Sequence, residues 1–244
     1  MKNKKDSFSE IIEGISPYRI LGDIGHAAAL ERFGPKVSER IAWCGNPEEA
    51  KIALTFDDGP HAVTTPLLIE TLHESDTAAT FFLVGKHIES HPEIARMLLK
   101  AGHELGNHTY SHAALSFLTS RQIRDEISLA EKAIQDTTGA SPHFLRPPNG
   151  FFTRRVLDIA EEMDYRVVIG DVYPRDPHRP GTGKIVARVL QRATNGSIII
   201  LHDGGNTRRV DRSQTLSAVA ELIPRLKSNG FQFVTLSELL NWRA

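Results

Sequence analysis

The stretch Lys51-Ile52-Ala53-Leu54-Thr55-Phe56-Asp57-Asp58-Gly59-Pro60 sets a pattern that recurs along the chain. Its first six residues form an apolar run of strand length, and Gly59-Pro60 is a turn that ends the strand. Two adjacent carboxylates, Asp57 and Asp58, lie between the run and the turn. A carboxylate at the end of a buried strand is costly to desolvate unless it has a partner, such as a cation or a proton. A solvated acidic turn is the other interpretation of these two residues.

Short apolar runs followed by helix-like segments continue after this stretch. Strand-length runs occur at 51–56, 78–84, 103–105, 143–145, 165–170, 197–201 and 231–236. Helical patterns lie between them at 65–74, 92–100, 120–137, 154–163, 184–193 and 214–227. About seven strands that alternate with helices predict an α/β protein with a parallel sheet, either closed as a barrel or open and doubly wound.

Polar residues of the kinds used in catalysis follow most of the expected strands. They are Asp57-Asp58, Asn107-His108, Arg146, residues 171–176, and His202-Asp203. In a barrel of parallel strands, the residues just past the carboxyl ends converge on one face, where active sites lie. Ionisable groups at five strand ends suit a closed ring better than an open crevice. We therefore expect a (β/α) barrel with helices around it.

The composition excludes several classes of function. The 244 residues are 40% hydrophobic and 24% charged, as in a soluble globular protein with a full core. A formal net charge of -1 gives no electrostatic case for nucleic acid or for an anionic membrane surface as a partner. Cys44 is the only cysteine, which excludes a disulfide framework and a thiolate metal cluster. The oligomeric state is left open.

No apolar run approaches the length that spans a bilayer. Residues 1–6 are basic, as at the start of a signal peptide, but no apolar segment follows them. We expect a cytoplasmic protein if the chain is complete, and an extracellular or cell-envelope protein if an export segment has been removed. Residues 1–50, with an expected helix at 26–33 and a Gly34-Pro35 break, are interpreted as an N-terminal extension or cap.

A second stretch, Gly106-Asn107-His108-Thr109-Tyr110-Ser111-His112, contains two histidines four residues apart. On a helical turn such a pair shares one face and holds a single metal ion. Two solvated histidines are the alternative. Together with a strand-end carboxylate from the first stretch, the pair supplies two nitrogens and one oxygen. That is the ligand set of a catalytic zinc site, which leaves a fourth position for water.

A third stretch, Phe144-Leu145-Arg146-Pro147-Pro148-Asn149-Gly150, is stiffened by two prolines that forbid a helix there. Arg146 is permanently charged and is able to hold a carboxylate through two nitrogens. Pro147 and Pro148 have no N–H, so the first free backbone donor is that of Asn149. A rigid turn that directs one N–H at a site is what an oxyanion hole requires. A surface loop with a solvated arginine is the alternative.

A further apolar run ends in Leu201-His202-Asp203 and puts an imidazole at the mouth of a strand. By strand alternation Ile200 and His202 face the same side, so Ile200 lines the site if His202 belongs to it. A lone histidine after a strand is structural more often than catalytic, and only the other stretches favour catalysis. Three arginines that follow are interpreted as a solvated basic loop: Arg208, Arg209 and Arg212.

Five motifs, in this order, resemble those of the NodB-like polysaccharide deacetylases, carbohydrate esterase family 4. They are TFDDGP (55–60), GNHTYSH (106–112), RPPNG (146–150), RDP (175–177) and ILHD (200–203). The resemblance implies a distorted (β/α) barrel, with residues 51–244 as the catalytic domain. It also implies metal-dependent removal of N-acetyl, sometimes O-acetyl, groups from sugars. The implied partner is an acetylated glycan that contains N-acetylglucosamine, of the chitin, chitooligosaccharide or peptidoglycan type.

The resemblance gives each matching residue a role. It implies that Asp57 is the general base, steadied by Arg146, and that His202 is the general acid, oriented by Asp176. One divalent metal is implied, with zinc expected and cobalt or nickel as alternatives; its ligands are Asp58, His108 and His112. The implied oxyanion and acetyl-pocket residues are Asn149, Ile200 and Pro148.

Two positions depart from the family's pattern. Asn149 stands where the family usually has tyrosine or another aromatic residue, and Pro177 stands where it usually has tryptophan. These replacements bear on substrate choice more than on hydrolysis. They motivate one alternative, a catalytically inactive carbohydrate-binding protein on the same scaffold. A second alternative, motivated by the missing export signal, is a hydrolase of a small non-polymeric amide.

Overall fold

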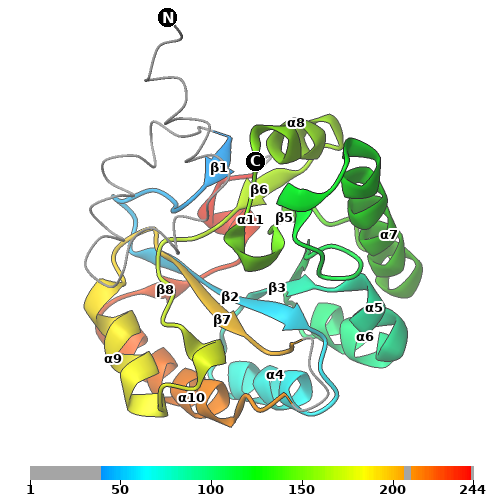
Figure 1. Ribbon diagram of the computed structural model, residues 1–244. Helices are drawn as coiled ribbons and strands as arrows, with labels where there is room; N and C mark the ends of the chain where they lie inside the picture. The colour runs from blue at the N-terminus through cyan, green and yellow to red at the C-terminus, as the bar shows by residue number, and fades with distance from the viewer. Residues whose placement is uncertain (1–39, 206–209, 243–244) are drawn as a thin grey trace, which may run out of the picture.

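The computed structural model describes residues 40–205 and 210–242 and shows a curled sheet with helices around its outside (Figure 1). The strand order is β1-β6-β5-β4-β3-β2-β7, and β8 pairs with the first residues of β2. All of these pairs are parallel, which confirms the expected α/β barrel. The strands are β1 (Ile41–Ala42), β2 (Lys51–Gly59), β3 (Thr80–Leu83), β4 (Glu104–Asn107), β5 (Phe144–Leu145), β6 (Arg166–Val168), β7 (Ile198–His202) and β8 (Gln232–Phe233).

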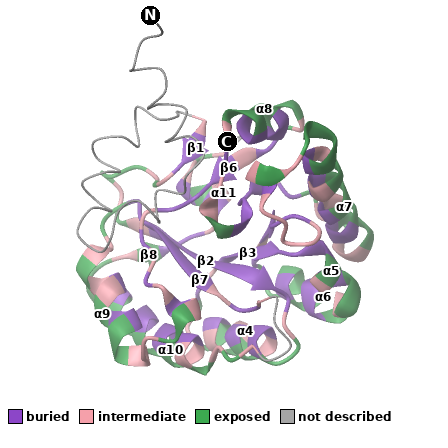
Figure 2. Ribbon diagram, viewed as in Figure 1, coloured by how far each residue is buried: buried purple, intermediate pink, exposed green. Residues whose placement is uncertain are grey.

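Helices cover the outer face of the sheet and turn their apolar sides toward it (Figure 2). They are α4 (Thr64–Glu74), α5 (Gly85–Ser90), α6 (Pro92–Lys100), α7 (Ser120–Thr138), α8 (Arg154–Glu162), α9 (Thr182–Arg192), α10 (Ser213–Ser228) and α11 (Leu236–Leu239). The described part of the chain also contains three short 3-10 turns: η1 (Leu115–Phe117), η2 (Pro148–Gly150) and η3 (Asp176–His178). No helix in the described ranges combines the length and hydrophobicity that a membrane crossing needs.

The barrel is distorted because isolated bridges, not a full ladder, join the two ends of the sheet. Cys44, just after β1, bridges to Ser197, and Val172, beyond β6, bridges to Ile199 of β7. Strand β1 lies before residue 51, where the main domain was expected to begin, yet it pairs with β6. The helix expected at 26–33 lies outside the described residues.

The alternation of β2 decides which side chains reach the barrel interior. Phe56 faces the helices, where its ring stacks on that of Phe81 with 4.9 Å between centroids. Ala53 belongs to a separate interior cluster with Phe82. Since successive side chains of a strand point to opposite faces, Asp57 points inward like Ala53. The apolar run therefore delivers its first carboxylate to the inside of the barrel.

His103, immediately before β4, is buried without a hydrogen-bond partner for its ring. It is 4% exposed, and its ring lies 5.3 Å from that of Phe81. Neither ring nitrogen has a partner within the described chain. Burial lowers the pKa of His103 to about 4, so the native protein keeps this ring neutral.

We expect the protein to lose stability as the pH falls from about 6.5 toward 4, and His103→Leu to remove part of that loss. The unfolded chain protonates this histidine near pH 6.5, whereas the folded protein resists protonation until about pH 4. The contribution of neutral His103 to the free energy of unfolding is complete above about pH 6.5. Roughly 3 kcal/mol of this contribution is lost by about pH 4. Urea unfolding at about pH 7 and 4.5, with a chelator present, measures it. His73→Gln, on the exposed side of α4, is the control. An identical pH dependence in wild type and His103→Leu would contradict the prediction.

Candidate metal and active site

A bulge at the end of β2 turns two neighbouring carboxylates toward the same cavity. Asp57 pairs with Phe82 of β3, but Gly59 pairs with the next residue, Leu83, so Asp58 is the extra residue. Its φ of 72° is left-handed, a conformation that aspartate adopts more readily than most residues. In a regular strand the two neighbours would face opposite sides. The bulge explains why both line the cavity.

A cavity of about 680 Å³ at the carboxyl ends of the strands collects most of the predicted site residues. Those on its lining are Asp57, Asp58, His108, His112, Arg146, Asn149, Ile200 and His202. Ile200 and His202 thus share a face, as strand alternation predicted. Pro177 also lines the cavity. The remaining two predicted residues are not on the lining. Asp176 lies behind His202, and Pro148 directly precedes Asn149.

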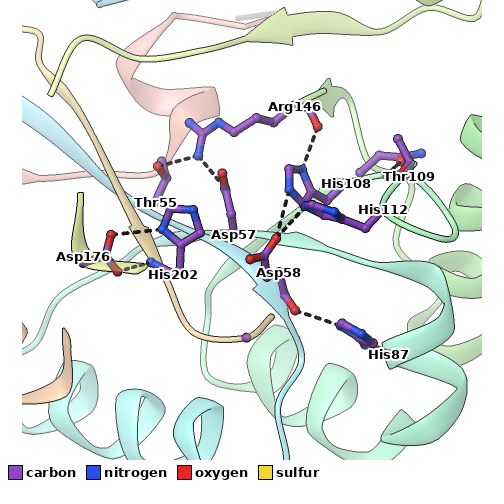
Figure 3. A network of polar contacts seen from close by, with 12 residues as sticks. Thr55, Asp57, Asp58, His87, His108, Thr109, His112, Arg146, Asp176 and His202 are labelled. Atoms are coloured by element: carbon purple, nitrogen blue, oxygen red, sulfur yellow. Dashed lines mark hydrogen bonds and ion pairs between the residues drawn. The ribbon is translucent and has the colours of Figure 1, made fainter. Parts of the chain in front are cut away.

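Asp58, His108 and His112 converge on one point (Figure 3). Asp58 Oδ1 lies 3.4 Å from His108 Nε2 and 2.9 Å from His112 Nε2. The three ligand atoms lie within 4.8 Å of one another. One carboxylate oxygen and two imidazole nitrogens at this spacing fit a divalent ion that accepts mixed nitrogen and oxygen ligands. Because all three side chains line the cavity, such an ion is accessible from it.

A hydrogen bond fixes which nitrogen of His108 carries a proton. Nδ1 of His108 lies 2.7 Å from the carbonyl oxygen of Arg146. A carbonyl oxygen only accepts, so Nδ1–H is the donor. Nε2, the nitrogen that faces Asp58, is then left either to donate to the Asp58 carboxylate or, in the neutral ring, to bind a metal through its lone pair. Metal-binding histidines are commonly oriented by such a bond.

The two histidines do not lie on a helical turn, so that expectation was wrong. His108 follows β4, and the chain then passes through left-handed residues at Thr109 (φ 68°) and His112 (φ 58°). Asn107 supports this loop, because its Oδ1 accepts a hydrogen bond from the Thr109 N–H at 2.8 Å. The side chains of Asn107 and Glu126, and the backbone N–H groups of Gly85 and Lys86, satisfy its backbone in place of helical hydrogen bonds. The spacing predicted the proximity of the two rings but not the backbone that creates it.

Asp58 is ionised despite its burial. Burial opposes ionisation, but hydrogen bonds from His108 and His112, with the charge on His202, outweigh it and hold the pKa of Asp58 well below its usual value. A carboxylate has to be deprotonated to bind a metal. Asp58 therefore meets this condition at neutral pH.

Arg212 and Gly204 also border Asp58, although neither stands out in the sequence. Arg212 Nε donates to the Gly204 carbonyl at 2.8 Å, and Nη2 lies 4.0 Å from Asp58 Oδ2. The Arg212 side chain is only 10% exposed, so the solvated loop expected here was wrong for this residue. Arg208 and Arg209 lie outside the described residues. A Cβ on Gly204 would overlap the Asp58 carbonyl oxygen, which explains the glycine.

Arg146 holds Asp57 from inside the barrel. Its Nη1 donates to Asp57 Oδ1 at 2.7 Å and to Thr55 Oγ1 at 2.8 Å. Its Nε donates instead to the Val168 carbonyl at 3.3 Å, so the carboxylate is held through one nitrogen and not through the expected two. The guanidinium carbon lies 4.1 Å from the centroid of the Phe82 ring. Within the described chain this arrangement leaves Asp57 Oδ2 without a hydrogen bond.

His202 is held by Asp176 on the opposite side of the cavity from His108 (Figure 3). Nδ1 of His202 donates to Asp176 Oδ1 at 3.0 Å, and the backbone N–H of His202 donates to Asp176 Oδ2 at 2.9 Å. The Thr215 hydroxyl also donates to Oδ2, which fixes the carboxylate in turn. With Nδ1 committed, Nε2 is the nitrogen of His202 left for the cavity.

The charge of Asp176 also changes the acidity of His202. Burial, the largest influence, favours the neutral ring. The charge of Asp176, its hydrogen bond, and the charges of Asp58 and Asp57 together outweigh burial and raise the pKa of His202 to about 9. His202 therefore carries a proton at neutral pH.

Asn149 has a left-handed backbone at the edge of the cavity, with φ 60° and ψ 12°. Two hydrogen bonds fix the turn around it, from Gly150 N to the Pro147 carbonyl at 3.0 Å and from Phe151 N to the Pro148 carbonyl at 3.3 Å. Asparagine tolerates this conformation better than most residues. The Asn149 N–H donates to no group in residues 40–205 and 210–242, which leaves it available to a ligand.

One strand-end carboxylate that was expected near the active face serves the fold instead. Asp171 accepts hydrogen bonds from the Ile198 N–H at 2.7 Å and from Ser197 Oγ at 2.9 Å. Burial raises the pKa of Asp171 to about 6. These bonds join the segment after β6 to β7, where the barrel lacks a full ladder.

Known proteins resemble this chain in sequence and in structure. The family model described as polysaccharide deacetylase matches residues 45–168. A peptidoglycan-N-acetylglucosamine deacetylase of Bacillus cereus is 38% identical over 205 residues, which are 83% of this chain and 94% of the relative. The crystal structure of the Bc1960 peptidoglycan N-acetylglucosamine deacetylase, in complex with an N-oxidanyl-benzamide, matches with a TM-score of 0.79 and 31% identity, over 88% of this chain and 96% of that one.

A second solved structure with the same fold is that of a pseudoenzyme. Wild-type BA3943, a CE4 family pseudoenzyme from Bacillus anthracis, matches with a TM-score of 0.77 and 27% identity, over 84% of this chain and 70% of that one. The fold therefore occurs in a deacetylase and in a pseudoenzyme. Whether this chain is a deacetylase or a pseudoenzyme therefore depends on the residues in its cavity.

Proposed function

Because the chain belongs to the polysaccharide deacetylase family, we propose that it hydrolyses N-acetyl groups of N-acetylglucosamine-containing glycans, of the chitin, chitooligosaccharide or peptidoglycan type, and releases acetate. Deacetylases of this family use a divalent metal. One observation carries the proposal: three converging side chains of metal-ligand type, a carboxylate with a free oxygen and a charged imidazole all line one cavity. We take residues 51–244 as the catalytic domain, to which β1 adds a strand.

We assign the metal to Asp58, His108 and His112. Two features support this assignment. Asp58 is ionised, and Nδ1–H of His108 is bound to the Arg146 carbonyl, which leaves Nε2 directed toward Asp58. Zinc suits the mixed ligand set, with cobalt and nickel as alternatives. A divalent ion bound there polarises an amide carbonyl and lowers the pKa of water to about 7.

We assign the role of general base to Asp57. Arg146 holds its Oδ1, so Oδ2 is left to take a proton from the water molecule that attacks the amide carbon. The bulge supports separate roles for the two aspartates, because it turns Asp58 toward the histidines while Asp57 stays beside Arg146. The backbone N–H of Asn149 donates to the amide oxygen as negative charge develops on it.

We assign the role of general acid to His202. The amide nitrogen does not leave as an anion, so it has to receive a proton when the C–N bond breaks. The raised pKa keeps that proton on His202 at neutral pH, and Asp176 orients the ring so that Nε2 carries it. Ile200, one strand position inward, is the proposed contact for the acetyl methyl group.

Two cavity positions separate this chain from the family's usual pattern. Asn149 and Pro177 line the cavity where that pattern has aromatic side chains. Neither holds the metal or moves a proton in this mechanism, so the inactive alternative gains no support from them. We propose that they shape the choice of glycan.

We expect the metal-loaded protein to release acetate from acetylated glycans and to lose this activity in chelator. Readdition of zinc or cobalt restores it, because the ligand side chains stay in place. Acetate is measured on N-acetylglucosamine oligomers of increasing length, on peptidoglycan fragments, and on small acetylated amines. Faster release from oligomers than from the monosaccharide supports a glycan substrate, and equal rates on small amides favour the small-amide alternative. Glycan binding without acetate release by the loaded protein would establish the inactive alternative instead.

A further inference from the structure

Two of the three proposed metal ligands have left-handed backbone conformations, which cost energy in residues other than glycine even though aspartate and histidine adopt them more readily than most. Asp58 has a φ of 72° and His112 a φ of 58°, and Thr109, between the histidines, has a φ of 68°. Such conformations persist only where the surrounding structure holds them. The ligand atoms converge only while these turns keep their shape. The question is which contacts hold them.

The start of helix α5 holds both ligand-bearing segments through their carbonyl groups. On the β2 side, the Val84 N–H donates to the Gly59 carbonyl at 2.8 Å. On the histidine side, the N–H groups of Gly85 and Lys86 donate to the carbonyls of Thr109 and Tyr110 at 3.0 and 2.9 Å. This short stretch therefore links the turn of Asp58 to the loop of His108 and His112.

His87 adds a side-chain hydrogen bond to these backbone contacts. Its Nδ1 lies 2.8 Å from the carbonyl oxygen of Asp58 itself (Figure 3). Because a carbonyl oxygen only accepts, Nδ1–H is the donor. The bond fixes the peptide group that follows the left-handed Asp58, and Gly204 packs against the same oxygen. The Asp58 side chain is aimed from this fixed backbone.

Glu126 of α7 holds the other left-handed ligand. Its Oε2 accepts a hydrogen bond from the Ser111 N–H at 2.8 Å, and its Oε1 accepts one from Ser111 Oγ at 2.6 Å. Ser111 directly precedes His112, so both carboxylate oxygens hold the residue next to the ligand. Glu126 is half-buried, and hydrogen bonds to a charged acceptor are stronger than neutral ones.

We propose that His87 and Glu126 are positioning residues that pre-organise the metal site and so set its metal affinity. Neither is one of the three ligands, and neither lines the cavity. Each acts through the backbone of a left-handed ligand turn, His87 on Asp58 and Glu126 on His112. The inference rests on the metal-dependent function proposed above.

The test compares variants that remove each contact with variants that keep it. In His87→Asn the amide nitrogen takes the place of Nδ1 and keeps the donor, whereas His87→Ala removes it. In Glu126→Gln the carbonyl oxygen accepts from the Ser111 N–H and the amide donates to Ser111 Oγ, whereas Glu126→Ala leaves both unpaired. Matched controls are His91→Ala, one turn after His87, and Asp125→Ala, on the exposed side of α7.

The readout is the zinc dissociation constant, measured by competition with a chromophoric chelator. We expect the alanine variants at 87 and 126 to bind zinc about 10–100-fold more weakly. We expect the asparagine and glutamine variants, and both controls, to stay near wild type. Melting of each protein in excess chelator shows whether it is folded before zinc is added. If an alanine variant does not fold, His87→Gln or Glu126→Asp replaces it, because each keeps a polar group but shifts it by one bond.

The outcomes separate this inference from the proposed function. Wild-type zinc affinity in the folded alanine variants, or equal weakening in the variants that keep the contact, would overturn the positioning role alone. Wild-type protein that binds zinc but releases no acetate would overturn the proposed function while the affinity comparison still stands. If wild-type protein binds no divalent ion, both fall together.

Discussion

Asp57→Asn is expected to lower acetate release by about 10²–10⁴-fold while metal affinity stays near the wild-type value. The asparagine oxygen still accepts the hydrogen bond from Arg146 Nη1, so the side chain keeps its place. It cannot take a proton from the attacking water. Because Asp57 is not one of the three converging ligands, zinc binding should not depend on its charge beyond a long-range effect.

The adjacent residue provides the control for this prediction. Asp58→Asn should weaken zinc binding, since it replaces an ionised ligand, and activity should fall because the metal is absent. The measurement pairs kcat at saturating zinc with the zinc dissociation constant for both variants. Loss of the Asp57 charge also leaves the buried Arg146 without its counter-ion, so thermal melting has to accompany the kinetics. An active Asp57→Asn variant would contradict the assignment of the base.

His202→Ala is the second large expected effect, a fall in kcat of about 10²–10⁴-fold from the loss of the general acid. An acid catalyst works only while protonated, so wild-type activity should decline as pH rises through the pKa of His202. Asp176→Asn removes the negative charge that raises this pKa. The pKa of His202 should fall, and the basic limb of the profile should move to lower pH.

Asp171→Asn is the matched control for the pH experiment. Asp171 is a buried aspartate that binds Ser197 and the Ile198 N–H and makes no contact with His202. Its replacement should leave the basic limb where it is. Profiles of kcat/KM against pH for the three zinc-loaded proteins, wild type, Asp176→Asn and Asp171→Asn, measure the limbs. A limb that does not move in Asp176→Asn would show that His202 does not supply the proton.

Periodicity predicted most of the fold because most elements carry their own local signal. The alternation of strands and helices after residue 50 predicted the parallel barrel, and alternation within β7 predicted that Ile200 and His202 share a face. Short elements were missed, including α11, although it begins with a capping box of Thr235 and Glu238. Strand β1 has two residues, α5 has six and α11 has four, and each is stabilised by the neighbours it packs against.

The candidate site shows a similar division. Residue types and spacing predicted which side chains gather, because strand ends of a barrel meet on one face. They did not predict how the gathering is achieved. The bulge at Asp58 depends on its register with β3, and the left-handed turn at His112 depends on Glu126 of α7. These are contacts between segments far apart in the chain, which no local pattern records.

Arg212 and Asp171 illustrate the same limit in opposite directions. Arg212 was expected in solvent but lies against Asp58, because its guanidinium is held by the Gly204 carbonyl. Asp171 was expected near the active face but binds the start of β7. Arg212 directly precedes α10 and Asp171 lies after β6, and for both a contact with another segment decides where the side chain lies.

Anomalous diffraction at the zinc absorption edge, from crystals grown with zinc, shows directly which side chains hold the metal. We expect one strong peak, about 2.0–2.2 Å from Asp58 Oδ1, His108 Nε2 and His112 Nε2, in protein that releases acetate. A peak held by other residues, or no peak between these three side chains in active crystals, would contradict it.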